Sequence, residues 1–266
     1  MYAKILKVEL QSSIFAIFNT GRFRLSEKMK EKILVNAKLV TAEKVFDGEL
    51  RISGGVIAEL GRRVKRKGSF EIIDAGGKYV MPGFIDIHTN GAAGFDISCG
   101  AYDESAGKFS LAREKYFAAL QKALRFYLTS GTTGVMLSSI SAPLENLLKS
   151  FEYIAEYKKS TDKFSEALRG IYVEGSFIKD SASRGAQNPE YFMRPSAGII
   201  NKMRGSADGL ISIVNIPPEW KGGELIRKLT DAGIVCAIGH SSAGADEFIA
   251  SVQNGSALVT HFLNGP

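Results

Sequence analysis

The feature that most constrains the fold is an alternation of short apolar strands with helices, which begins at Phe84. The strand segments are apolar at successive positions, which is typical of strands buried on both faces of a parallel sheet covered by helices. Six such strands are predicted, at 84–88, 133–140, 168–177, 210–216, 234–240 and 257–261. Helices are predicted at 111–129, 143–159, 189–203, 223–232 and 243–254, where apolar residues recur at helical spacing or a proline or glycine marks an end.

Two α/β architectures fit this alternation: an open doubly wound sheet and a TIM-like (β/α)8 barrel. Polar residues follow the strands around the whole series, which favours a barrel whose site lies at the C-terminal strand ends. The six predicted strands indicate an incomplete barrel. No Gly-x-Gly-x-x-Gly motif follows a strand, which argues against dinucleotide binding.

The residues before the barrel predict a separate small domain. Short strands spaced by glycine turns indicate a small N-terminal β-sandwich or open sheet over residues 29–80, and the partial barrel is assigned to 81–266. Residues 1–28 do not continue either pattern and are assigned to an uncertain N-terminal extension.

The composition indicates the cellular compartment of the protein and the kinds of molecule that it can bind. The two cysteines, Cys99 and Cys236, lie far apart in dissimilar contexts, which favours a reduced, cytoplasmic protein. No apolar run reaches the ~18 residues that a membrane span needs, and no zinc-finger or RNA-binding signature is present. The net charge of +6 is a mild bias that either favours an anionic small molecule or reflects a solvated basic surface.

Glu174 lies in the predicted strand at 168–177, and His240 and His261 each end a predicted strand. In a barrel these strand ends converge on one mouth. Two imidazoles and one carboxylate form a donor set of catalytic zinc sites, in which a further position stays open for water. Each residue alone could be a hydrogen-bonded core residue, but three in register predict a site for one divalent ion. Zinc is the ion that this donor set favours.

Further polar residues fall near these strand ends. His88 could be another metal ligand, orient a substrate, or hydrogen-bond to a ligand, and its neighbour Asn90 is a weak ligand that could contact substrate. Gln187, in the loop after Glu174, and Asn264, after His261, could also reach a substrate.

The chain resembles the N-acetylglucosamine-6-phosphate deacetylase family of the amidohydrolase superfamily over residues 29–266. The Pro-Gly-Phe-Ile-Asp run alone marks only the superfamily, whereas the later motifs are more specific to the deacetylases. The motifs that carry the resemblance are PGFIDIH at 82–88, VEGSFI at 173–178, GAQNPE at 185–190, PE at 218–219, GHS at 239–241 and THFLN at 260–264.

This resemblance implies a (β/α)8 barrel and a divalent metal, zinc or iron among others, held by Glu174, His240 and His261. It implies hydrolysis of the N-acetyl group of N-acetylglucosamine-6-phosphate, which gives glucosamine-6-phosphate and acetate. Asn264 and the adjacent backbone of Gly265 would help to hold the sugar phosphate. It also implies a homodimer when the protein is full length. The family's catalytic aspartate would lie beyond Pro266, so the chain is expected to be C-terminally truncated and of doubtful activity by itself.

Two alternatives remain open at this point. Gln187 stands where many members of the family have a substrate-binding histidine, so another amidohydrolase, acting on a cyclic amide or a different N-acyl amino sugar, is an alternative. A non-catalytic remnant that retains the fold and lacks the aspartate is the other.

Overall fold

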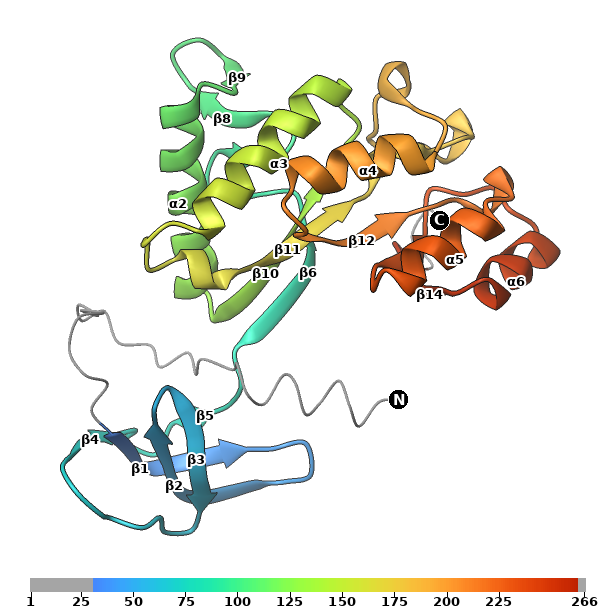
Figure 1. Ribbon diagram of the computed structural model, residues 1–266. Helices are drawn as coiled ribbons and strands as arrows, with labels where there is room; N and C mark the ends of the chain where they lie inside the picture. Colours follow the sequence, from blue (N-terminus) through green and yellow to red (C-terminus); the bar gives the residue numbers. More distant parts are fainter. Residues whose placement is uncertain (1–30, 263–266) are drawn as a thin grey trace. The chain divides into compact units, whose positions relative to one another are not determined.

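The structure is a computed structural model that describes residues 31–262, and its elements follow the predicted alternation (Figure 1). The proposed extension at 1–28 and the candidate residues Asn264 and Gly265 lie outside the described residues. No helix in the described part of the chain is long and apolar enough to cross a lipid bilayer.

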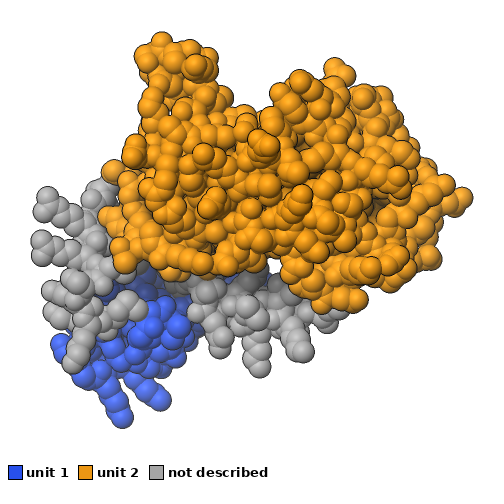
Figure 2. Space-filling view, turned by 45° about the horizontal axis from the view of Figure 1, so that its top comes forward, with its two compact units in different colours: residues 1–85, 128–133 blue, residues 86–127, 134–266 orange. Residues whose placement is uncertain are grey.

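The chain divides into two compact units (Figure 2). Among the described residues, unit 1 comprises 31–85 and 128–133, and unit 2 comprises 86–127 and 134–262. All three histidines and Glu174 belong to unit 2, so the chemistry predicted from the sequence falls within one unit.

The described strands of unit 1 form one five-stranded sheet, which confirms a separate N-terminal sheet domain. The central strand β1 pairs antiparallel with β2 and parallel with β4 and β5, while β3 pairs with β2. Leu34, Leu39 and Leu50 are buried in the apolar cluster of this sheet. The strands are β1 (Glu31–Val40), β2 (Val45–Ser53), β3 (Val56–Gly61), β4 (Phe70–Asp74) and β5 (Tyr79–Val80).

Unit 2 is built on a six-stranded sheet, as the sequence predicted, in the order β14-β13-β12-β11-β10-β6. Successive strands from β10 to β14 pair in parallel. This order, with each strand beside the next one in sequence, is that of an incomplete barrel wall. The strands are β6 (Phe84–Thr89), β10 (Thr132–Ser139), β11 (Leu168–Val173), β12 (Ile211–Asn215), β13 (Val235–Ile238) and β14 (Ser256–Val259).

Helices connect these strands, and α3 and α4 pack side by side along the sheet (Figure 1). On the sheet itself, Tyr172, Ile213 and Ala237 form a buried cluster from three neighbouring strands. The helices are α2 (Arg113–Thr129), α3 (Leu144–Lys158), α4 (Ala197–Ser206), α5 (Gly223–Asp231) and α6 (Ala245–Gln253).

Three local predictions differ from the structure. The strand predicted at 168–177 ends at Val173, and Gly175–Phe177 forms a 3-10 turn. The helix predicted from Pro189 begins at Ala197, because Pro189–Tyr191 forms only a single 3-10 turn and Pro195 disfavours helix in the residue before it. Ser196 then caps α4 by accepting from the Ile199 N–H. A small sheet of β7 (Phe95–Asp96), β8 (Gly100–Asp103) and β9 (Lys108–Ser110) was not predicted, since strands of two to four residues carry no readable periodicity.

Candidate metal centre

The candidate ligands all lie at the C-terminal ends of the parallel strands. His88 is the penultimate residue of β6, and Glu174 directly follows β11. His240 and His261 each come two residues after a strand, β13 and β14 respectively. Because the carboxyl ends of neighbouring parallel strands meet at one edge of a sheet, these four side chains are brought to the same place.

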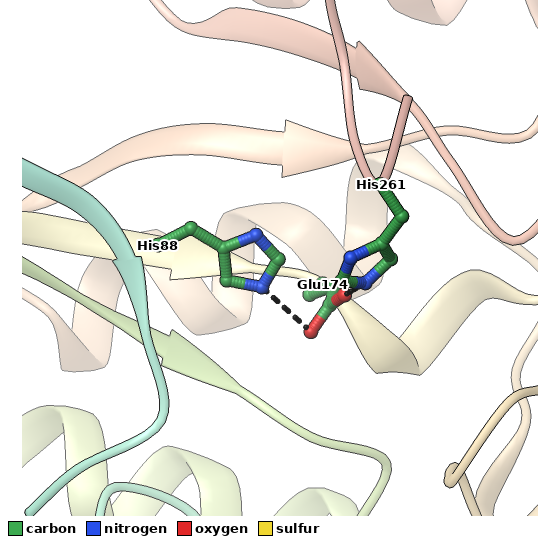
Figure 3. Close-up of side chains that lie close together, drawn as sticks. All are labelled: His88, Glu174 and His261. Atoms are coloured by element: carbon green, nitrogen blue, oxygen red, sulfur yellow. Dashed lines mark hydrogen bonds and ion pairs between the residues drawn. The ribbon is translucent and has the colours of Figure 1, made fainter. Parts of the chain in front are cut away.

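The three histidine side chains converge on the carboxylate of Glu174. His88 Nε2 lies 3.2 Å from Glu174 Oε2, a contact drawn in Figure 3. His240 Nε2 and His261 Nε2 lie 3.0 Å and 2.8 Å from the other oxygen, Oε1. One carboxylate therefore faces three imidazole nitrogens, and the structure brings together all the ligands that the sequence suggested.

Two of the histidines have an unusual backbone. His240 and His261 both adopt the left-handed conformation, each with φ of 53°. This region is sparsely populated by residues other than glycine, and such residues cluster at functional sites. The left-handed turn at the end of β13 and of β14 directs each imidazole toward Glu174.

The hydrogen bonds of His240 assign its tautomer. His240 Nδ1 lies 2.9 Å from the carbonyl oxygen of Ser183, which can only accept, so Nδ1 carries a proton. In the neutral ring, Nε2 then carries a lone pair, which faces the Glu174 carboxylate. Two electron-rich atoms 3.0 Å apart repel each other unless a proton or a cation lies between them.

Burial and the histidines act in opposite directions on the pKa of Glu174. The residue is only 2 % exposed, and burial raises the pKa of its carboxyl. Hydrogen bonds to His240 and His88 outweigh burial and hold that pKa well below its usual range. For His240, burial lowers the pKa, while Glu174 and the Ser183 carbonyl raise it above the ordinary value. The site thus keeps a buried anion beside nitrogen donors.

These residues fit a divalent metal ion. One ligand atom each from His88, Glu174 and His261 lies within 4.8 Å of the others. Imidazole nitrogen and carboxylate oxygen are the donors that zinc and related ions accept. The lone pair of His240 Nε2 also faces the Glu174 carboxylate. A cation between these atoms would stabilise the arrangement. The assignment of Glu174, His240 and His261 as the ligand set stays a prediction, because the group within 4.8 Å contains His88 and not His240.

Asn90 and Gln187, two of the residues predicted to contact substrate, form hydrogen bonds within the protein. The Asn90 amide donates to the Ser138 carbonyl at 2.8 Å. The Gln187 carboxamide accepts from the Ser141 N–H at 2.6 Å and donates to Glu174 Oε2 at 3.4 Å. Contact of either residue with a substrate stays a prediction.

Sequence reasoning missed Tyr172 as a neighbour of the site. Its ring meets the ring of His88 edge to face, with centroids 5.0 Å apart, and its hydroxyl hydrogen-bonds to Thr260. Tyr172 precedes Glu174 by two positions, and Thr260 precedes His261. A side chain two positions before a ligand on the same strand face is the signal that could have identified Tyr172.

Another missed feature anchors the turn after His240. Glu219, after β12, accepts from the Ser241 hydroxyl at 2.8 Å and from the Ser242 N–H at 2.6 Å. Lys179 donates to the Glu219 carbonyl at 2.9 Å. These bonds hold the chain directly after His240, and so support its left-handed backbone.

No protein-family model matches the chain, but known proteins resemble it in sequence. The N-acetylglucosamine-6-phosphate deacetylase of Bacillus subtilis (strain 168) is 28 % identical over 243 residues, which are 89 % of this chain and 57 % of the relative. The bovine enzyme of the same name is 29 % identical over 235 residues, 86 % of this chain and 54 % of the relative.

Solved structures give the same result. A mutant N-acetyl-D-glucosamine-6-phosphate deacetylase from Mycobacterium smegmatis, in complex with N-acetyl-D-glucosamine-6-phosphate, superposes with a TM-score of 0.68 and 25 % identity, covering 89 % of this chain and 56 % of that one. The Pasteurella multocida deacetylase shares the fold with a TM-score of 0.69 and 23 % identity, covering 87 % of this chain and 56 % of that one.

The chain spans about half the length of the curated relatives it matches, 57 % and 54 % of the two above. Over that shared part, the sequence similarity, the six-stranded parallel sheet and the separate N-terminal sheet agree with one another. Over the part it shares with them, the chain is similar in sequence to proteins named N-acetylglucosamine-6-phosphate deacetylase and has their fold.

Proposed function

We propose that this chain carries the metal-binding part of an enzyme that hydrolyses the N-acetyl group of N-acetylglucosamine-6-phosphate to glucosamine-6-phosphate and acetate. The observation that carries the proposal is the buried Glu174 carboxylate surrounded by three imidazole Nε2 atoms. The relatives that share this part of the chain are deacetylases of that substrate by name.

Glu174, His240 and His261 would hold the ion, for which zinc is the favoured identity, and His88 is a further candidate. A bound divalent ion supplies Lewis acidity, which polarises an amide carbonyl and lowers the pKa of water. The chain's own residues prepare that site. Glu174 contributes a negative charge that is shielded from solvent, and the Ser183 carbonyl keeps the His240 proton on Nδ1, so that Nε2 is free to bind.

The substrate proposed is a small amino-sugar phosphate, and Asn264 and Gly265 are the residues proposed to hold it. Metabolic use in amino-sugar catabolism, in the cytoplasm and as a homodimer of the full-length protein, belongs to the same proposal. The substrate rests on the names of the relatives, Asn264 and Gly265 on the motif resemblance at 260–264, the homodimer on the family resemblance, and the cytoplasm on the two dissimilar cysteines.

The test is acetate release by the full-length protein loaded with zinc or cobalt. N-acetylglucosamine-6-phosphate is compared with unphosphorylated N-acetylglucosamine and with a dihydropyrimidine ring, and the Glu174→Gln variant serves as the control. The proposal expects acetate from the phosphorylated sugar in preference to the other two, and none from Glu174→Gln. Equal acetate release by Glu174→Gln would contradict it.

The same assay separates the alternatives. Turnover of the dihydropyrimidine in preference to the sugar would indicate another amidohydrolase. Tight metal uptake without release of acetate from any sugar would indicate a non-catalytic remnant. In that case the metal part of the proposal stands and the activity is rejected.

A further inference from the structure

The segment from Ser183 to Asn188, called here the 183–188 segment, runs along the candidate metal centre and touches two of its ligands. We propose that Gln187 in this segment is a positioning residue of the metal site, which fixes the Glu174 carboxylate by a hydrogen bond from its side-chain NH2 group. This inference rests on the proposed metal site and deepens it.

The 183–188 segment holds His240 at its start. The Ser183 carbonyl accepts the Nδ1 proton of His240 at 2.9 Å. Gly185 lies against the same ring, since a Cβ built on it would be 3.3 Å from His240 Cε1. Gly185 also has a φ of +56°, which a side chain would strain. The segment therefore sets the tautomer and the position of one candidate ligand.

The direction of the Gln187 carboxamide is determined by its partners. The Ser141 N–H can only donate, so the atom 2.6 Å from it is Oε1. The NH2 group is then left to face Glu174 Oε2, at 3.4 Å. Gln187 is only 7 % exposed, so both ends of its amide are engaged inside the protein.

Neighbouring residues leave room for this arrangement and secure it. A Cβ at Gly175 would lie 2.2 Å from Gln187 Oε1 and 2.4 Å from the Ser141 nitrogen, so only glycine allows the carboxamide to fit there. A second bond, from the Asn188 N–H to the Ser141 hydroxyl at 2.6 Å, ties the segment to the chain after β10.

The chemical reason for a carboxamide at this position is its constant donor. An imidazole Nε2 can carry a proton and donate to Glu174, or it can bind a cation through its lone pair, but it cannot do both. The Gln187 NH2 group donates in either case and adds no charge. Glu174 is therefore kept in one orientation both before and after an ion enters, which is how outer hydrogen-bond partners raise metal affinity.

The test is the affinity of the purified full chain for Co2+, measured from its visible absorption in competition with a chelator. Gln187→Met keeps the side-chain length and removes both hydrogen bonds. We expect Co2+ to bind about 10- to 100-fold more weakly, as is usual when a hydrogen-bond partner of a ligand is lost. The visible spectrum should also change, because Glu174 is no longer held in one orientation.

Ser141→Ala is the matched control, since it removes the tie to Asn188 and leaves the bond between Gln187 and Glu174. We expect its Co2+ affinity to stay within about threefold of the wild type, while its melting temperature falls. A purely structural role for Gln187 would make the two variants alike in Co2+ affinity. If Gln187→Met does not fold, Gln187→Asn, which is too short to reach both partners, should show the same loss in smaller measure.

The outcomes separate the two proposals. Wild-type affinity in Gln187→Met, with an unchanged spectrum, overturns the positioning role and leaves the metal site intact. A wild-type chain that binds no Co2+ overturns the metal site itself, and the positioning role with it.

Discussion

Two buried glutamates follow neighbouring strands of the parallel sheet and have opposite surroundings. Glu174, after β11, faces the Nε2 atoms of three histidines. Glu219, after β12, faces the hydroxyl groups of Ser241 and Ser242 and the Ser242 N–H. Both are shielded from solvent, at 2 % and 9 % exposed. The strand ends thus present the same chemical group twice, in two different environments.

The difference shows how a functional carboxylate can be told from a structural one. Hydroxyl and backbone N–H groups are permanent donors, so they satisfy the Glu219 anion and leave nothing for a ligand to complete. A neutral imidazole donates through only one of its two nitrogens, and His240, whose proton is on Nδ1, presents the lone pair of Nε2 to Glu174. That arrangement is stabilised by a cation, which makes the end of β11 the candidate site and the end of β12 its support.

The largest expected effect comes from changing what surrounds Glu174. His240→Ala removes a candidate ligand and the donor that the Ser183 carbonyl orients. We expect metal affinity to fall by about 10²-fold or more, and acetate release from N-acetylglucosamine-6-phosphate to be lost with it. Isothermal titration with zinc and an acetate assay measure the two effects. Full activity in a metal-free His240→Ala protein would refute the metal account.

A smaller effect is expected from Glu219→Gln. The amide retains one acceptor, whereas Glu219 accepts from Ser241 through one oxygen and from Ser242 through the other, so one of these buried partners loses its bond. A loss of about 1–3 kcal/mol of stability follows, or a fall of several degrees in Tm. Thermal unfolding of the metal-free protein measures it.

Ser241→Ala, which removes only the hydroxyl bond to Glu219, should cost less stability than Glu219→Gln. The comparison between the two glutamates fails if Glu219→Gln leaves Tm unchanged while it abolishes metal binding, since Glu219 would then belong to the site and not to its support.

The smallest effect concerns a third carboxylate, Asp96 in β7. Burial raises the pKa of Asp96, and the N–H groups of Cys99 and Ser98 offset this only in part. The folded state therefore binds the proton more tightly than the unfolded chain, whose pKa is about 3.9. The stability that Asp96 contributes is fully present below that value and is lost as pH rises through the raised pKa.

Asp96→Asn keeps the acceptor for both N–H groups and removes the charge. We expect a gain of about 1 °C in Tm at pH 7 and no gain at pH 3.5, measured by thermal unfolding at both pH values. A loss of Tm at pH 7 would mean that the Asp96 charge is stabilised by groups other than these two.

The sequence predicted the parallel sheet well, because its strands are apolar on both faces and its helices have regular spacing. Glu174, His240 and His261 were found for the same reason, as polar residues directly after apolar runs. The short strands of the β7–β9 sheet and the true start of α4 were not predicted, since turn chemistry and prolines decide them locally.

The surroundings of the ligands were beyond sequence reasoning. Gln187 reaches Glu174 across 13 positions and Ser141 across 46, and Tyr172 meets Thr260 across 88. Such contacts depend on where the loops of separate strands meet. The left-handed backbone of His240 and His261 was equally hidden, because histidine is not a residue that requires it.

The most direct test of the account is the metal content of three purified proteins: the wild type, Glu174→Gln and Glu219→Gln, each saturated with zinc, desalted and analysed by mass spectrometry of the elements. The account predicts about one ion per chain in the wild type and in Glu219→Gln, and none in Glu174→Gln. A Glu174→Gln protein that retains its ion, or a wild type that holds none, would contradict it.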